Sequence, residues 1–317
     1  FLNDFIHDLL AEDPRTVDNR QPDDGLVQHI LCRYFRNADI VPLMHLGKDA
    51  FQETDILDVT MPITKHNYKV KDIKQLVPTI RKAFELALKG RPGPVLVDVP
   101  RNLFFAEVQF EPLMQVKPHH GQPDADFLIC AAEAAEEIAR AAQPVVIVGG
   151  GVISAGATDA VIAFIEKYHL PVAHTLMGLG AIPSSHPQSL GFAGMHGEKV
   201  ANHAIGAADL VIALGSRFGD RQTGNLKKYT QNTKFIHVDI DPAEIDKNIG
   251  NSLGLAGDMK VILELLMKHE PNSDLKAWWT KIQEWQEAYD YDYHVNRLTV
   301  PWAMHQVAQS TKGKPYA

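Results

Sequence analysis

Glycine-rich turns follow apolar runs between residues 145 and 258, and their composition suits them to hold a ligand. The apolar run Val145–Val148 is followed by Gly149, Gly150 and Gly151. A solid apolar run that ends in glycine is typical of a strand buried on both faces that meets a ligand-binding loop. Glycine lets the backbone approach a pyrophosphate closely, and free N–H groups in such turns attract anions. The other turns of the series are Thr175–Gly180, Gly194–Gly197, Gly215–Arg221, His237–Ile245 and Gly257–Asp258. A single glycine could mark a turn without a ligand, but the series favours a dinucleotide site.

Charged side chains stand within two of these turns. Arg217 and Arg221 lie four residues apart in a glycine-containing loop; they could hold an anion or form ordinary surface ion pairs. Asp239 and Asp241 resemble a metal-binding pair. Because a strand directs both to one face, hydrogen bonding to ribose hydroxyls is the favoured interpretation over metal binding.

The elements that must position these turns follow from the apolar pattern. Strands and helices alternate along this part of the chain, which predicts an α/β fold with a right-handed, doubly wound parallel sheet and ligands at the carboxyl ends of its strands. The strands are expected at 145–148, 171–174, 209–214 and 234–239, and the helices at 157–168, 198–206 and 258–268.

The flanking regions predict further domains. Pro78 fits the first turn of a helix that ends at Gly90, and residues 95–99 form a buried parallel strand. Asp124 or Asp126 can cap an alanine-rich helix that ends near Ala142. We expect a partial first domain over 1–104, a linker over 105–123, a central domain over 124–270 and a helical tail over 271–317. In that tail, Trp278, Trp279 and Trp285 are expected in the core or a subunit interface.

Composition limits the classes of function. The 317 residues are 45% hydrophobic and 22% charged, with a net charge of −8. Such a chain has no broad basic field, which argues against nucleic acid or an anionic membrane as the main partner. No apolar run reaches the length of about 20 residues that spans a membrane, so we expect a cytoplasmic protein. Cys32 and Cys130 are far apart and are interpreted as free thiols.

A family resemblance emerges from motifs in series. The chain resembles the catalytic subunit of acetolactate synthase from about residue 46 to residue 317. The Arg91–Pro94 segment also occurs in glyoxylate carboligase, a relative of the same architecture, whereas Ala50–Glu53, Ile63–Asn67 and Gly194–Gly197 favour acetolactate synthase. The matching segments are Asp49–Glu53, Pro62–Asn67, Gly90–Pro100, Thr175–Gly180, Gly194–Gly197, Arg217–Arg221 and Asp239–Ile245.

The resemblance implies an activity, cofactors and partners. Acetolactate synthase decarboxylates pyruvate and joins it to a second 2-oxoacid in branched-chain amino acid biosynthesis. It uses thiamine diphosphate, Mg²⁺ and a largely structural FAD held by the central domain of three α/β domains. The active site lies between two subunits, so the resemblance implies a homodimer or tetramer, and a regulatory subunit is a further expected partner.

The resemblance also assigns residues. Phe51, Gln52 and Lys65 match catalytic and substrate-channel positions, and Met195, Asp220 and Arg221 line the same entrance. His66 and His196 are candidates for acid–base catalysis, and the alternative that each is a hydrogen-bonded structural histidine has equal weight. Gly219 departs from the family, which usually has Asp there. The residues that match FAD contacts are Gly149, Gly150, Gly151, Thr175, Leu176, Met177, Gly194, Met195, Gly215, Ser216, Arg217, Arg221, Asp239, Ile240, Gly257 and Asp258.

Three parts of the family pattern are missing from the sequence, and one of them is the glycine-rich Ser-Gly-Pro-Gly-Ala segment. The glutamate that activates thiamine diphosphate does not follow His29–Arg33. From about Asn37 the sequence instead matches a part of the family sequence that lies many residues further on. The metal-binding Gly-Asp-Gly motif would lie beyond Ala317. We therefore expect these 317 residues alone to be inactive, as part of a chain with omitted segments. Glyoxylate carboligase and a non-catalytic FAD-binding paralogue remain alternatives, while a Gly-Gly-Gly turn makes an NAD dehydrogenase less favoured.

Overall fold

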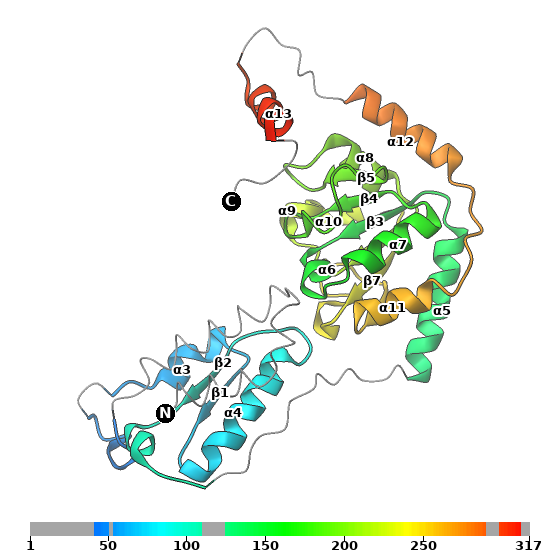
Figure 1. Cartoon of the computed structure of the whole chain (residues 1–317). Helices are drawn as coiled ribbons and strands as arrows, with labels where there is room; N and C mark the ends of the chain where they lie inside the picture. The colour runs from blue at the N-terminus through cyan, green and yellow to red at the C-terminus, as the bar shows by residue number, and fades with distance from the viewer. Residues whose placement is uncertain (1–40, 51–52, 110–123, 290–297, 312–317) are drawn as a thin grey trace. The chain divides into compact units, whose positions relative to one another are not determined.

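The computed structural model describes residues 41–50, 53–109, 124–289 and 298–311 (Figure 1). The chain divides into two compact units, Phe1–Pro123 and Asp124–Ala317. The predicted skip from Arg33 to Asn37 lies outside the described residues.

The first unit contains a two-stranded parallel sheet. β1 (His66–Lys69) pairs in parallel with β2 (Val95–Asp98), which confirms the predicted buried strand. α4 (Ile73–Leu88) packs on β2, and its buried residues Ala83 and Ala87 join a core with Val95 and Val97. The other described elements of this unit are η1 (Leu43–His45), α3 (Ile56–Thr60), η2 (Met61–Ile63) and η3 (Arg101–Phe105).

The predicted position of Pro78 is wrong. α4 begins at Ile73, where the Asp72 side chain accepts a hydrogen bond from the N–H of Lys74 at 3.0 Å. Pro78 therefore lies inside the helix, where proline costs about 3 kcal/mol relative to alanine. The Asp72 cap and the burial of Ile80, Ala83 and Ala87 offset that cost.

The second unit is built on a six-stranded parallel sheet with the order β5-β4-β3-β6-β7-β8. The chain moves outward from β3 to β5, returns to place β6 beside β3, and then moves outward again to β8 (Figure 1). This reversal between β3 and β6 confirms the doubly wound sheet and marks its switch point. The strands are β3 (Pro144–Val148), β4 (Val172–His174), β5 (Ser189–Phe192), β6 (Leu210–Leu214), β7 (Lys234–Asp239) and β8 (Leu253–Ala256).

Helices pack around this sheet largely where the sequence predicted them. α5 (Ala125–Arg140) starts at Asp124, whose carboxylate accepts a hydrogen bond from the N–H of Phe127 at 2.8 Å, so Asp124 is the cap. α11 (Met259–Leu266) packs against both α5 and α7 (Thr158–Tyr168). Strands β5 and β8 and the short helices α6, α9 and α10 were not predicted. The remaining helices are α6 (Gly150–Ser154), α7 (Thr158–Tyr168), η4 (Leu176–Gly178), α8 (Lys199–Ala207), α9 (Asp220–Thr223), α10 (Leu226–Tyr229), η5 (Pro242–Glu244), α11 (Met259–Leu266), α12 (Lys276–Ala288) and α13 (Val300–Thr311).

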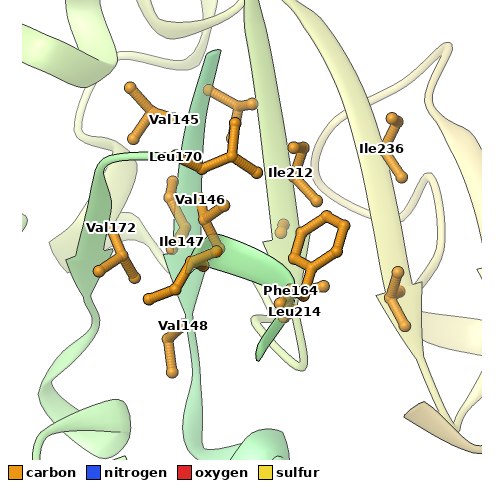
Figure 2. Close-up of a cluster of buried hydrophobic side chains, with 14 of the residues drawn as sticks. Val145, Val146, Ile147, Val148, Phe164, Leu170, Val172, Ile212, Leu214 and Ile236 are labelled. Carbon is orange, nitrogen blue, oxygen red and sulfur yellow. The ribbon is translucent and has the colours of Figure 1, made fainter. Parts of the chain in front are cut away.

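The core of the second unit lies around β3 and β6 (Figure 2). Every residue of Val145–Val148 is fully buried, and Phe164 of α7 and Ile212 of β6 belong to the same core. Because both faces of a central strand are covered, its apolar run is continuous rather than alternating. Burial of each large side chain contributes about 1.5–3 kcal/mol, which fixes the strand ends from which the turns project.

The tryptophans of α12 attach this helix to the sheet. Trp278 is buried, and its indole N–H donates to the carbonyl of Pro144 at 3.0 Å. The indole N–H of Trp279 donates to the carbonyl of His169 at 2.8 Å. Trp278 is therefore a core residue, one of the two roles predicted for it. No helix among the described residues is both long and apolar enough to cross a membrane.

Replacement of Trp278 tests this attachment. We expect Trp278→Ala to lower the free energy of unfolding by about 3–5 kcal/mol, because it opens a cavity and removes the hydrogen bond to the Pro144 carbonyl. Urea denaturation measures the change. Trp279→Ala is the matched control, since Trp279 is only partly buried; equal losses in the two variants would contradict the core assignment of Trp278.

Candidate functional site

The predicted ligand-binding turns gather at one edge of the six-stranded sheet. Each follows a different strand, and the strands pair in parallel, so their carboxyl ends lie at the same edge. The order is Gly149–Gly151 after β3, Thr175–Met177 after β4, Gly194 and Met195 after β5, Gly215–Arg217 after β6, Ile240 after β7, and Gly257 and Asp258 after β8.

The glycines of the β3 and β6 turns allow two backbones to touch. A Cβ atom on Gly149 would lie 2.1 Å from the carbonyl oxygen of Gly215, and one on Gly151 would lie 2.7 Å from the Gly215 Cα. A Cβ on Gly178 would lie 2.1 Å from the carbonyl oxygen of Val148. No side chain fits at these distances, so the packing of the turns itself requires glycine at all three positions.

The expectation that the β3 turn offers free N–H groups is wrong for two of its residues. The N–H of Gly149 donates to the carbonyl of Leu214 at 2.9 Å, and that of Gly151 donates to the carbonyl of Gly215 at 3.1 Å. Thr175 also has an internal partner, since its hydroxyl accepts a hydrogen bond from the N–H of Gly178 at 3.1 Å. The N–H groups of Gly149 and Gly151 are therefore not available to bind an anion at this edge.

Exposed apolar side chains surround the same edge. Leu176 is 66% exposed, Met177 71%, Met195 57% and Ile240 36%, although each follows directly on a buried strand or its turn. The Cβ of Met177 lies 3.1 Å from the position of a Cβ on Gly150, so Met177 lies against the β3 turn. Large apolar side chains gathered at one exposed edge are typical of a binding surface.

The two predicted arginines flank the start of α9. Both are exposed, and the guanidinium of Arg221 lies 3.9 Å from the sulfur of Met195. The N–H of Met195 donates to the carbonyl of Arg221 at 2.8 Å, which joins the β5 turn to α9. The contact of Arg221 with Asp220 at 3.9 Å is fully exposed to solvent and contributes little energy. Gly219 is the N-cap of α9 and has open space around its Cα, so the departure from the family pattern causes no clash.

Two buried histidines that sequence reasoning missed support these turns. The Nε2 of His237 lies 2.8 Å from the carbonyl of Ser216, and the Nδ1 of His174 lies 3.3 Å from the carbonyl of Gly178. Burial lowers the pKa of both imidazoles, against the opposing effect of these hydrogen bonds. Their signal in the sequence was a histidine inside an apolar strand, which implies a hydrogen-bonded partner.

The predicted acidic residues organise backbone turns. A carboxylate oxygen of Asp239 accepts from the N–H of Asp241 at 2.9 Å, and Asp241 accepts from the N–H of Ala243 at 3.0 Å. Asp258 caps α11 by accepting from the N–H of Lys260 at 2.9 Å. Within the described residues, no group of three or more His, Cys, Asp or Glu side chains is arranged to hold a metal ion.

The first unit contains Lys65, a predicted site residue whose partners the structure shows. Lys65 donates from its ammonium group to three carbonyls, those of Leu86, Lys89 and Arg91, at 2.7, 2.6 and 2.9 Å. The lysine therefore stabilises the carboxyl end of α4, and a substrate carboxylate would have to compete with these carbonyls. Phe51 and Gln52 lie outside the described residues.

The two candidate acid–base histidines and Cys130 complete the predicted residues. His66 contacts Tyr68 edge to face, with ring centroids 4.4 Å apart, and His196 is exposed. Cys130 is a free thiol whose sulfur lies 3.6 Å from the carbonyl of Gly254.

Comparison with known proteins places this geometry in a family. Residues 131–266 match the model described as "Thiamine pyrophosphate enzyme, central domain". The chain is 39% identical over 265 residues to a probable acetolactate synthase large subunit of Methanocaldococcus jannaschii, covering 82% of this chain and 44% of the relative. It is 35% identical over 291 residues to the large subunit of acetolactate synthase isozyme 3 of Escherichia coli, covering 86% of this chain and 49% of the relative.

The chain belongs to the acetolactate synthase family. A third relative, an acetolactate synthase large subunit of Mycobacterium tuberculosis, is 42% identical over 263 residues, 78% of this chain and 41% of that protein. The chain thus spans less than half the length of these three relatives. Their names do not favour glyoxylate carboligase or a non-catalytic paralogue.

The contact between the β3 and β6 turns predicts the effect of adding one methyl group. We expect Gly149→Ala to lower the free energy of unfolding by about 1–3 kcal/mol or more, because the methyl group would overlap the Gly215 carbonyl. Gly219→Ala is the matched control, since nothing lies within 4 Å of its added atom, and should change stability by less than about 0.5 kcal/mol. Urea denaturation measures both variants; similar effects would rule out the proposed backbone contact.

The buried histidines predict a pH dependence of stability. Their pKa values are lower in the folded protein than in the unfolded chain, so the unfolded chain binds more protons as the pH falls below about 6.5. The contribution of the two neutral histidines to stability is therefore complete above that pH. It is lost as the pH decreases from 7 toward 5.

Thermal unfolding of wild-type, His237→Gln and His196→Gln proteins at intervals from pH 7 to pH 5 tests this dependence. The melting temperature should fall less steeply in His237→Gln, whereas the exposed control His196→Gln should follow the wild type. An unchanged slope in His237→Gln would show that His237 does not contribute.

Proposed function

We propose that this chain is the part of an acetolactate synthase large subunit that carries its FAD-binding central domain, together with part of its thiamine-binding region. Its reaction is the decarboxylation of pyruvate and the joining of the product to a second 2-oxoacid. The observation that carries the proposal is the gathering of backbone-packed glycine turns, exposed apolar side chains and two exposed arginines at the carboxyl edge of a doubly wound sheet.

The chemistry of this edge fits FAD. A flavin and an adenine present flat apolar faces, which match Leu176, Met177, Met195 and Ile240. A pyrophosphate carries negative charge, and arginine pairs with phosphate oxygens through a planar set of donors. The N–H groups of Gly149 and Gly151 have backbone partners, and we assign Arg217 and Arg221, which are exposed, as the groups that would neutralise the pyrophosphate.

Other residues would orient the ligand. Asp239 is buried at the end of β7, where its carboxylate would accept hydrogen bonds from a ribose. Gly150, Gly194, Gly215, Ser216, Gly257 and Asp258 would form the walls of the crevice through their turns. Thr175 would act indirectly, since its hydroxyl holds the turn that presents Leu176 and Met177.

The catalytic chemistry needs further groups. Thiamine diphosphate would supply the carbon–carbon-joining chemistry, and we place Phe51, Gln52 and Lys65 beside it on the family resemblance alone. Met195, Asp220 and Arg221 would border the substrate entrance. The described residues do not fit a magnesium site, because they contain no cluster of three ligands, so we derive no step through the metal.

Partners follow from the same proposal. The relatives are named large subunits, and we infer that this protein likewise works with a regulatory subunit. We further propose a homodimer or tetramer, since an active site shared between subunits needs a second copy.

The arginine assignment predicts a change in FAD affinity. We expect Arg221→Ala to weaken FAD binding by about ten- to a hundredfold, because a hydrogen bond between charged groups contributes about 1.5–3 kcal/mol. Quenching of flavin fluorescence during titration of the 317-residue chain measures the dissociation constant. Arg140→Ala is the matched control, since Arg140 is an exposed arginine of α5 that pairs with Glu136 of the same helix. Equal affinity in wild type and Arg221→Ala would remove Arg221 from the site.

The activity itself requires the intact protein, purified from its native source. With thiamine diphosphate, Mg²⁺ and FAD, we expect it to consume pyruvate and form acetolactate, which a colorimetric assay detects. Consumption of glyoxylate in preference to pyruvate, or no turnover of either 2-oxoacid, would contradict the proposed function.

A further inference from the structure

Phe218 adopts an unusual backbone conformation between the two predicted arginines. Its φ is +50°, in the left-handed region that bulky side chains rarely adopt, and its side chain is only 3% exposed. Such a conformation persists only where the surroundings impose it, and it occurs preferentially at ligand sites. Phe218 follows Arg217 directly and precedes Arg221 by three residues.

Three aromatic rings enclose the ring of Phe218. Those of His237, Phe235 and Tyr229 lie at centroid distances of 5.0, 5.8 and 6.3 Å. Their interplanar angles of 78°, 86° and 72° are edge-to-face arrangements, which aromatic pairs prefer. Phe218 therefore attaches the loop after β6 to β7 and α10 by its ring.

Hydrogen bonds hold the backbone on either side of that ring. His237 contacts the carbonyl of Ser216, and the Ser216 hydroxyl donates to the side-chain oxygen of Gln222 at 3.0 Å. The side chain of Asn248 donates to the carbonyl of Arg217 at 2.8 Å. The loop is thus fixed from within while the side chains of Arg217 and Arg221 remain exposed.

We propose that Phe218 is a positioning residue for the FAD site. Its buried ring anchors the loop, and the left-handed turn at its backbone sets Arg217 and Arg221 on the exposed side of that loop. Phe218 itself does not touch the ligand. This inference rests on the proposed function, because it assumes that the two arginines bind FAD.

Substitutions at Phe218 separate positioning from a general loss of stability. Phe218→Leu removes the aromatic ring, and Phe218→Gly removes the ring but relieves the backbone conformation. Phe164→Leu is the matched control, because Phe164 is a fully buried phenylalanine of α7 outside the loop. The measurements are the melting temperature, the dissociation constant for FAD, and the visible circular dichroism of bound flavin.

We expect both Phe218 variants to weaken FAD binding by about tenfold or more and to alter the dichroism of any flavin that binds. Phe164→Leu should lose at least as much melting temperature while it changes the FAD affinity by less than about twofold. If Phe218→Leu does not fold, the FAD affinity of Phe218→Gly tests the positioning role.

Two results would overturn the positioning role. One is wild-type FAD affinity in either folded Phe218 variant. The other is a loss of FAD affinity in Phe164→Leu that is as large, for the same drop in melting temperature, as the loss in the Phe218 variants. Arg217→Ala and Arg221→Ala distinguish this failure from that of the proposed function. If these two weaken FAD binding and the Phe218 variants do not, only the positioning role fails; if the wild type does not bind FAD, both fail.

Discussion

The structure depends on a backbone-to-backbone contact at the switch point of the central sheet. The reversal of strand order places the turn after β3 beside the turn after β6. Gly149 and Gly151 pack directly on Gly215, at distances that exclude any side chain. The N–H groups of Gly149 and Gly151 then donate to carbonyls of β6 and its turn. This contact joins the two halves of the sheet at the edge where their loops meet, so it sets the spacing of every group proposed to bind ligand.

A consequence of this contact is a division of roles between backbone and side chains. The N–H groups of Gly149, Gly151 and Gly215 donate to carbonyls of the sheet and its turns, so we assign much of the proposed recognition to exposed side chains. In the proposed site, apolar residues such as Met177 and Met195 and the two arginines would supply it from the loops after β4, β5 and β6, where all four are exposed. α9 links two of these loops, since Arg221 accepts a hydrogen bond from Met195 and Gln222 accepts one from Ser216. The proposed binding edge therefore consists of exposed side chains on loops that backbone and side-chain hydrogen bonds connect.

The sequence predicted the parts of the fold that are governed by local pattern. Val145–Val148 and Leu210–Leu214 read as continuous apolar runs because both faces of a central strand are buried. β5 and β8 lie at the sheet edges, are short and contain Gly191 and Gly254, so neither gave such a run. The partners of Gly149 and Lys65 were not predictable, because they are carbonyls distant in sequence that only the tertiary fold brings near. The individual FAD contacts, from Gly149 to Asp258, were assigned by the family resemblance. Whether these residues contact the ligand remains a prediction.

The most direct test of a ligand site at this edge is hydrogen–deuterium exchange of the 317-residue chain with and without FAD. Bound FAD should slow exchange in the turns after β3, β4 and β6, at residues 149–154, 175–179 and 215–221, because it covers them and restrains their opening. The helices of the first unit should exchange at unchanged rates. Slowed exchange confined to segments away from the carboxyl edge, or no change at saturating FAD, would contradict the account.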